Sequence, residues 1–168
     1  MKPIDSKQLR SVLGSYPTGV TIVTTVDALA QPVGVTVNSF ASLSLDPPLV
    51  SWCLRRSSYS LLAFRHSRRF TINVLGSSHS ALCTRFAKGD PNKWHGIPFQ
   101  LGGNGCPSLE QSIAALECTH VGEHDAGDHV LFIGEIKQAW AAQGAHPLVF
   151  FRGGYYELAL PTDKPIAC

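Results

Sequence analysis

The sequence predicts a mainly β fold in which antiparallel strands form a barrel and short helices lie at its periphery. Runs rich in β-branched residues outnumber the segments with a helical pattern, and such residues favour strands. Gly, Pro, Asn and Asp interrupt the chain at short intervals, which is typical of many short strands joined by turns. The helical segments are too irregular for the repeated strand–helix crossovers of a doubly wound parallel sheet.

The first expected element is a short helix near the N-terminus. Asp5 or Ser6 can cap its start, and Gly14 with Pro17 ends it. Its apolar residues share one face: Leu9, Val12 and Leu13. From Gly19 the pattern GVTIVTTV predicts a strand instead.

A turn over 27–32 ends that strand, and further strands follow it. Their positions are 33–38, 48–54, 69–75, 116–121, 130–140 and 148–151. Short helices are expected between them at 58–66, 78–87 and 108–115, the last because Ser108 and Gln111 have capping-box spacing. Segment 88–107 holds five glycines and three prolines and is expected to be a long loop, of the kind that is usually functional or mobile.

The length of 168 residues fits one domain, because domains usually have roughly 100–200 residues. We therefore expect a single domain over 1–168, with a core of about 6–160 and a loose tail after Leu160. A chain of this size buries roughly 70% of its unfolded surface, so its core needs neither disulfides nor metals.

The balance of charge argues against nucleic acid as the main partner. Fourteen Lys and Arg residues stand against twelve Asp and Glu, for a net charge of +2. The five cysteines are odd in number and form no CxxC pair, so no disulfide framework or zinc ribbon is indicated. The N-terminus lacks the apolar stretch of a secretion signal, and no segment predicts a membrane helix, which favours a soluble, cytoplasmic protein.

Several familiar catalytic motifs are missing from the sequence. It has neither a P-loop nor a GxGxxG turn between strand and helix, and it has no GxSxG nucleophile motif. The histidines His120, His124 and His129 suggest a metal-dependent enzyme as one alternative, but their spacing fits no familiar site, and the prediction is no metal.

Segment 34–48 combines the polar and apolar groups that a planar ligand needs. This segment offers hydroxyl and amide groups from Thr36, Asn38, Ser39 and Ser42. Val37 and Phe40 supply apolar contact. The pattern alone fits an ordinary polar strand-to-turn segment equally well.

A second polar cluster, RRSSYS at 55–60, lies between a predicted strand and a predicted helix. Its hydroxyls can cap that helix or bind a phosphate, and both functions require the same residues. Arg55 and Arg56 favour an anion, although paired arginines at the end of a strand are often only solvated charge.

Seven segments occur in an order that resembles the short-chain flavin reductases, the reductase components of two-component flavin-dependent monooxygenases. They are SYPTGVTIVTT (15–25), GVTVNSFASLSLDPPLVSW (34–52), RRSSYSLLAF (55–64), RRFTINVL (68–75), RFA (85–87), GDH (127–129) and PLVFFRGGYYEL (147–158). The resemblance implies a split β-barrel of the Greek-key, FMN-binding-protein-like type, usually as a homodimer. It further implies FMN or FAD as the flavin, NADH or NADPH as the hydride donor, and a partner monooxygenase.

The resemblance also assigns roles to individual residues. The flavin-binding residues that it implies are Thr36, Val37, Asn38 and Ser39 along the ring system, Ser42 close behind, Ser57, Ser58 and Ser60 at the phosphate, Phe86 beside the flavin, and Tyr155. His129 is implied as the catalytic histidine, which holds the reduced dinucleotide near the flavin, and Asp128 orients its loop. Phe86 is alternatively a core phenylalanine.

In the 88–107 loop the resemblance is loose. Lys93 and Trp94 can attract or stack on a dinucleotide, or the tryptophan can cover a neighbouring subunit. A carrier that binds flavin or haem on a similar barrel, without oxidising NADH, remains an alternative to the reductase. Such a carrier keeps segment 36–42 but needs no His129.

Overall fold

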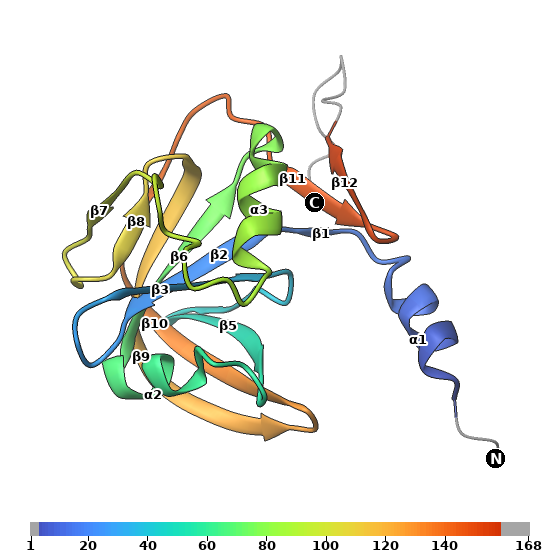
Figure 1. Ribbon diagram of the computed structural model, residues 1–168, viewed down its shortest axis with the longest axis horizontal. Coiled ribbons are helices and arrows are strands. Elements are labelled where there is room, and N and C mark those ends of the chain that lie inside the picture. The colour runs from blue at the N-terminus through green and yellow to red at the C-terminus, as the bar shows by residue number, and fades with distance from the viewer. Residues whose placement is uncertain (1–3, 159–168) are drawn as a thin grey trace.

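The computed structural model describes residues 4–158, and its centre is a seven-stranded antiparallel sheet in the order β3-β2-β6-β9-β10-β5-β4 (Figure 1). The strands are β2 (Thr21–Val26), β3 (Pro32–Val37), β4 (Ala41–Leu45), β5 (Pro48–Arg55), β6 (Arg69–Leu75), β9 (Ser112–Ala126) and β10 (His129–Ala141). Edge strand β3 approaches β5 near the other end of the sheet, but the two do not pair as strands. The expected mainly β fold is confirmed, and the barrel is split between β3 and β5.

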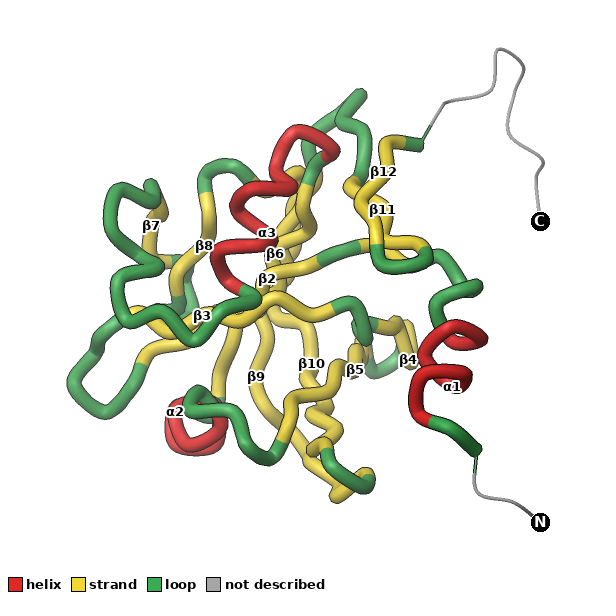
Figure 2. The backbone as a smooth tube through the Cα atoms, turned by 45° about the vertical axis from the view of Figure 1, so that its right-hand side comes forward, coloured by secondary structure: helices red, strands yellow, loops and turns green. Residues whose placement is uncertain are grey.

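Smaller elements surround the barrel. They are α1 (Ser6–Leu13), α2 (Leu61–Ser67), the 3-10 helix η1 (Ser77–His79), α3 (Ser80–Phe86), the strands β1 (Thr18–Gly19), β11 (Leu148–Phe151) and β12 (Gly154–Glu157), and the hairpin of β7 (Phe99–Leu101) and β8 (Pro107–Leu109). The strands β1, β11 and β12 form a separate sheet. Both views place this sheet and α1 on the side of the barrel away from β7 and β8 (Figure 2).

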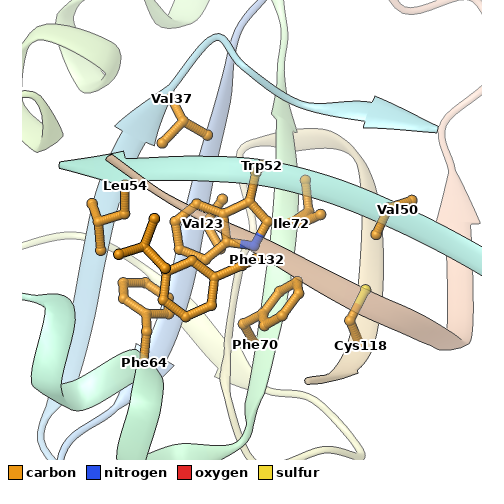
Figure 3. Close-up of a cluster of buried hydrophobic side chains, with 11 residues drawn as sticks. Val23, Val37, Val50, Trp52, Leu54, Phe64, Phe70, Ile72, Cys118 and Phe132 are labelled. Carbon is orange, nitrogen blue, oxygen red and sulfur yellow. The ribbon is translucent and has the colours of Figure 1, made fainter. Parts of the chain in front are cut away.

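An aromatic cluster fills the barrel (Figure 3). Trp52 stacks on Phe132 with ring centroids 4.7 Å apart, and Phe64 meets the edge of Trp52 at 4.8 Å. Strand residues and α2 supply these side chains, so α2 closes one side of the core. A second cluster lies under α3 and includes Leu82, Phe86 and Leu109. These two cores hold β3, β5 and α3 in place around the opening of the barrel.

Most elements expected from the sequence are present. Asp5 caps α1 by accepting a hydrogen bond from the Gln8 amide at 3.0 Å, and the expected strands correspond to β2, β3, β5, β6, β9, β10 and β11. Helix α2 begins at Leu61 because residues 58–60 form a turn. Within residues 4–158 no helix has the length and hydropathy needed to cross a bilayer. The tail expected after Leu160 lies outside the described residues.

The helix expected at 108–115 is wrong, because this stretch contains β8 and the start of β9. Leu109 is buried in the second cluster, and its amide donates to the Asn73 side chain at 2.8 Å. The Ser112 hydroxyl donates to the Leu109 carbonyl at 2.6 Å, which fixes a turn where a helix was expected. Burial and these contacts outweigh the local capping pattern of Ser108 and Gln111.

Three further elements were not expected. Segment 41–45 is strand β4, the region 88–107 contains β7, and β12 follows β11 in a hairpin. Strand β9 is also longer than the expected 116–121, and pairs with β10 as far as Ala126. The long β9–β10 hairpin therefore carries its turn to the level of the end of β5, where Arg55 faces His129.

Candidate functional site

A pocket of 1130 Å³ lies along the split of the barrel, between β3, the end of β5 and the segment after α3. Nine of the eleven residues expected at the site line it: Thr36, Val37, Asn38, Ser39, Ser57, Ser58, Ser60, Phe86 and His129. They come from four separate parts of the chain, namely the end of β3 with the residues directly after it, the turn before α2, α3 and the start of β10. The fold therefore brings together residues that the sequence places far apart.

Two hydroxyls of the β3 segment are engaged within the protein. The Thr36 hydroxyl donates to the Cys83 carbonyl at 2.7 Å, which ties β3 to α3. The Cys53 amide donates to the Ser39 hydroxyl at 2.9 Å, which ties the segment after β3 to β5. These contacts fix the backbone of this wall, whereas the side chain of Asn38 is exposed beside the pocket.

The turn before α2 supplies a second, hydroxyl-rich wall. The Ser58 amide donates to the Arg55 carbonyl at 3.0 Å, and the Ser60 amide donates to the Ser58 hydroxyl at 3.2 Å. Ser57 and Arg55 also line the pocket. A guanidinium beside several hydroxyls is suited to an anionic group such as a phosphate.

His129 is the first residue of β10 and lies opposite Arg55 of β5. Its Nδ1 is 2.7 Å from a carboxylate oxygen of Asp128, and the ring is one-third exposed in the pocket. The hydrogen bond from His129 lowers the pKa of the Asp128 carboxyl below its ordinary value. With Nδ1 occupied by the carboxylate, Nε2 is the ring nitrogen left for a ligand.

An aromatic group closes the pocket on the side of α3. Phe86 meets Trp94 edge to face at 4.8 Å, and Lys93 Nζ lies 5.9 Å from the centre of the Phe86 ring. Burial lowers the pKa of Lys93. Phe86 is only 1% exposed and belongs to the second core cluster, so it borders the pocket and is also a core residue.

Gly34 makes this packing possible. A Cβ atom at this position would lie 2.7 Å from Phe86 and 3.0 Å from Trp94, much closer than side chains normally approach. Without a side chain at Gly34, both rings can pack directly on β3. The loop expected at 88–107 thus contributes Trp94 and Lys93 to the pocket wall.

Ser42 and Tyr155 are not among the residues that line the pocket. Ser42 is exposed on edge strand β4, where it pairs with Val50. The Tyr155 hydroxyl accepts a hydrogen bond from the Cys83 thiol at 3.0 Å, and the Cys83 carbonyl in turn accepts the one from Thr36. Tyr155 therefore contacts Cys83, the residue that binds Thr36 in the β3 wall of the pocket.

Cys53 and Leu54 line the pocket although the sequence did not indicate them. They follow Trp52 in β5, and only the approach of β5 to β3 places them at the site. Asp27 and Val33 come from the region of the β2–β3 turn and also line it. One sequence signal could have indicated these four residues: each belongs to, or directly adjoins, a predicted strand that ends near a polar cluster.

The three histidines considered for a metal do not form a common site. His120 is buried, its Nε2 is 2.9 Å from the Gly122 carbonyl, and its ring lies against Phe132. His129 instead faces the pocket. Over residues 4–158 there is no group of three or more His, Cys, Asp or Glu side chains placed to hold a metal ion.

Taken by its chemistry, the pocket suits a flat, partly apolar ligand that carries an anionic group. Residues 13–159 match the sequence model of the flavin reductase like domain. The chain is also 41% identical, over 163 residues, to the reductase subunit of a flavin-dependent monooxygenase from Rhodococcus jostii, and this match covers 97% of the chain and 82% of that protein.

Solved structures give the same result. Nitrilotriacetate monooxygenase component B from Mycobacterium thermoresistibile superimposes with a TM-score of 0.92 at 37% identity, covering 98% of this chain and 92% of that one. An NADH:FAD oxidoreductase from Streptomyces globisporus, in complex with NAD and FAD fragments, superimposes with a TM-score of 0.89 at 31% identity. That match covers 97% of this chain and all (100%) of the other.

Proposed function

Because the chain belongs to the flavin reductase-like family, it is an NAD(P)H-dependent flavin oxidoreductase, and we propose that the pocket along the split barrel is where it reduces FMN or FAD. The observation that carries this proposal is the gathering of nine expected site residues around one pocket. Its volume of 1130 Å³ is ample for a flavin, since ligand pockets usually measure about 300–1,000 Å³.

The donor set fits a flavin. The ring system lies along Thr36, Val37, Asn38 and Ser39 in this proposal, where strand backbone and the exposed Asn38 amide can bind its polar edge. The phosphate is received by Ser57, Ser58 and Ser60, with Arg55 adding charge. Phe86 and Trp94 form the apolar wall, with Lys93 beside them.

When bound, the flavin accepts the hydride that the reduced nicotinamide gives up, so the bond-making chemistry belongs to the two ligands. The residues of the chain bind and align them. His129, held by Asp128 through Nδ1, presents Nε2 to the dinucleotide and keeps it near the flavin. No paired carboxylates are needed for such a reaction.

The reduced flavin is supplied to a partner monooxygenase. The relative from Rhodococcus jostii is itself the reductase subunit of such an enzyme. A flavin that must leave is held weakly, as a substrate, and the contacts available here are mainly hydroxyls and strand backbone. Ser42 and Tyr155 lie outside the pocket of one protomer, and we assign Tyr155 to support of the Cys83 segment.

We also propose that the protein is a homodimer. Helix α1 has no buried residue, and its apolar side chains are open: Leu9 is 43% exposed, and Val12 and Leu13 are each 64% exposed. Figure 1 shows the helix projecting away from the barrel. An exposed apolar helix face of this kind is typical of an interaction surface. The same apolar face of a second copy of the chain can bury it.

A single domain with a core of about 6–160, acting in the cytoplasm, completes the proposal. The four cysteines between residues 4 and 158 are free thiols, as is usual in a reducing compartment. The family match over 13–159 runs through the whole barrel and supports one domain.

The test is to mix the purified protein with NADH or NADPH and to add FMN, FAD or riboflavin in turn, following the nicotinamide absorbance. We expect oxidation of the dinucleotide only when a flavin is present. If no flavin supports oxidation while flavin or haem still binds, the protein is a carrier and the proposal is wrong.

A further inference from the structure

The turn at Gly127 and Asp128, between Ala126 of β9 and His129 of β10, is contacted from outside the hairpin by Arg56, which follows β5. The Arg56 Nε donates to the Gly127 carbonyl at 2.9 Å, and its Nη2 is 2.8 Å from an Asp125 carboxylate oxygen. The Arg56 backbone amide donates to the Asp128 carbonyl at 3.0 Å. Arg56 therefore binds three residues at this end of the hairpin: Asp125, Gly127 and Asp128.

Arg56 itself is not part of the pocket lining, although its neighbours Arg55 and Ser57 are. Successive residues at the end of an extended strand point in opposite directions. Arg55 is thus placed at the pocket, opposite His129, while Arg56 reaches the turn. The two arginines, which look equivalent in the sequence, have different surroundings.

The two turn residues lie at the exposed end of the hairpin. Residues 124–128 are all exposed, and Gly127 has a positive φ of 63°, so strand pairing up to Ala126 and His129, rather than burial, holds this end of the hairpin. Exposed segments with few apolar contacts open at low free-energy cost. The contacts from Arg56 add to this pairing a restraint on the two turn residues immediately before His129, Gly127 and Asp128.

We propose that Arg56 is a positioning residue for hydride transfer, which sets the place of the His129 ring by fixing the Gly127–Asp128 turn and the neighbouring Asp125 side chain. This inference rests on the function proposed above for His129. The planar guanidinium suits the task because it can donate to a carbonyl and a carboxylate at once, whereas a lysine ammonium offers a single point of charge.

The experiment is steady-state kinetics on Arg56→Ala, alone and combined with His129→Ala. We expect Arg56→Ala to raise the KM for NADH about fivefold while the KM for flavin changes less than about twofold. In the His129→Ala background the same change should have no further effect on the KM for NADH, because nothing is left to position. Arg56→Lys should also raise this KM, which provides a second variant if Arg56→Ala does not fold.

Arg65→Ala is the matched control. Arg65 forms an ion pair with Glu123 of the same hairpin at 2.9 Å, but it neither binds the turn nor lines the pocket. We expect the KM of Arg65→Ala for NADH to match that of the native protein. Equal effects of Arg56→Ala with and without His129, or equal rises in the KM for flavin and NADH, overturn the inference. If His129→Ala itself leaves the KM for NADH unchanged, the role proposed for His129 is wrong, and that failure is distinct.

Discussion

The Ser39 hydroxyl and the Cys53 backbone exchange two hydrogen bonds across the split of the barrel. The Cys53 amide donates to Ser39 Oγ at 2.9 Å, and Ser39 Oγ donates to the Cys53 carbonyl at 3.4 Å. Ser39 follows edge strand β3, and Cys53 belongs to β5 near the opposite end of the sheet order. One side chain therefore joins the two walls between which the pocket lies.

Replacing Ser39 tests this junction. In Ser39→Ala the Cys53 amide loses its acceptor, and we expect the free energy of unfolding to fall by about 1 kcal/mol. The KM for flavin should rise about threefold, because the two walls are no longer held together. Urea denaturation and steady-state kinetics measure both. Ser78→Ala, at an exposed serine outside the pocket, is the control, and equal behaviour of the two variants contradicts the assigned role.

His129→Ala tests the dinucleotide site. Removing the imidazole leaves the flavin walls at β3 and at the turn before α2 intact, so the KM for NADH should rise about tenfold and the flavin affinity should change little. Steady-state kinetics with each substrate varied, together with flavin titration by fluorescence, gives the two values. Equal losses for both ligands would show that His129 does not act on the dinucleotide.

Gly34→Ala tests the aromatic wall. The new methyl group would lie 2.7 Å from Phe86 and 3.0 Å from Trp94, so one ring must move. We expect a loss of about 1–3 kcal/mol in the free energy of unfolding, together with weaker flavin binding. In the matched variant Gly122→Ala, the added atom meets Ile133 at an ordinary 3.9 Å. Similar stability of the two variants would mean that the packing on β3 is loose.

The Cys118 thiol predicts a loss of stability at alkaline pH. Burial, with smaller effects of Cys106 and Glu117, raises its pKa from 9.0 to about 12. The folded protein keeps this proton when the unfolded chain releases it, so the contribution is complete below pH 9 and is lost toward pH 12, at about 1.4 kcal/mol per pH unit.

We therefore expect the free energy of unfolding to fall less steeply above pH 9 in Cys118→Ala than in the native protein. Denaturant titrations at a series of pH values measure the slope. Cys53→Ala is the comparison. Burial also raises the pKa of the Cys53 thiol, but this thiol is less buried than that of Cys118. Identical slopes for native protein and Cys118→Ala would contradict the expectation.

Helix α1 provides a test of the homodimer. The double change Val12→Asp with Leu13→Asp places charge on the open apolar face, where both side chains are 64% exposed. We expect light scattering to show a dimer for the native protein and a monomer for this variant. Leu29→Asp, at a leucine that is 79% exposed in the β2–β3 turn, should remain dimeric. A native protein with the mass of a monomer would rule the dimer out.

The strands of the barrel could be predicted because their β-branched runs are buried and continuous. Strand β4 could not, since ASLSL has no β-branched residue, carries two serines and lies mostly exposed at an edge. The capping pattern of Ser108 and Gln111 is a local signal, and the burial of Leu109 overrides it. Local patterns failed where a contact distant in sequence decides the backbone.

The site shows the same division. Thr36 to Ser39, and Ser57, Ser58 and Ser60, line the pocket as expected, because each group is nearly continuous in the sequence and stands in a segment that resembles the flavin reductases. Cys53 was missed because only the approach of β5 to β3 brings it to the pocket. Nor could the sequence separate Arg55 from Arg56, since their different surroundings depend on where the β9–β10 turn lies.

The open ends of the seven-stranded sheet also bear on solubility. Strands β3 and β4 each have a side without a neighbour in the sheet, and β4 carries Leu43 and Leu45, which are 52% and 93% exposed. Bare edges with apolar side chains invite pairing with other chains and so favour aggregation. If the proposed homodimer forms, any edge that it covers is removed from such pairing, so assembly would protect the newly made chain against aggregation.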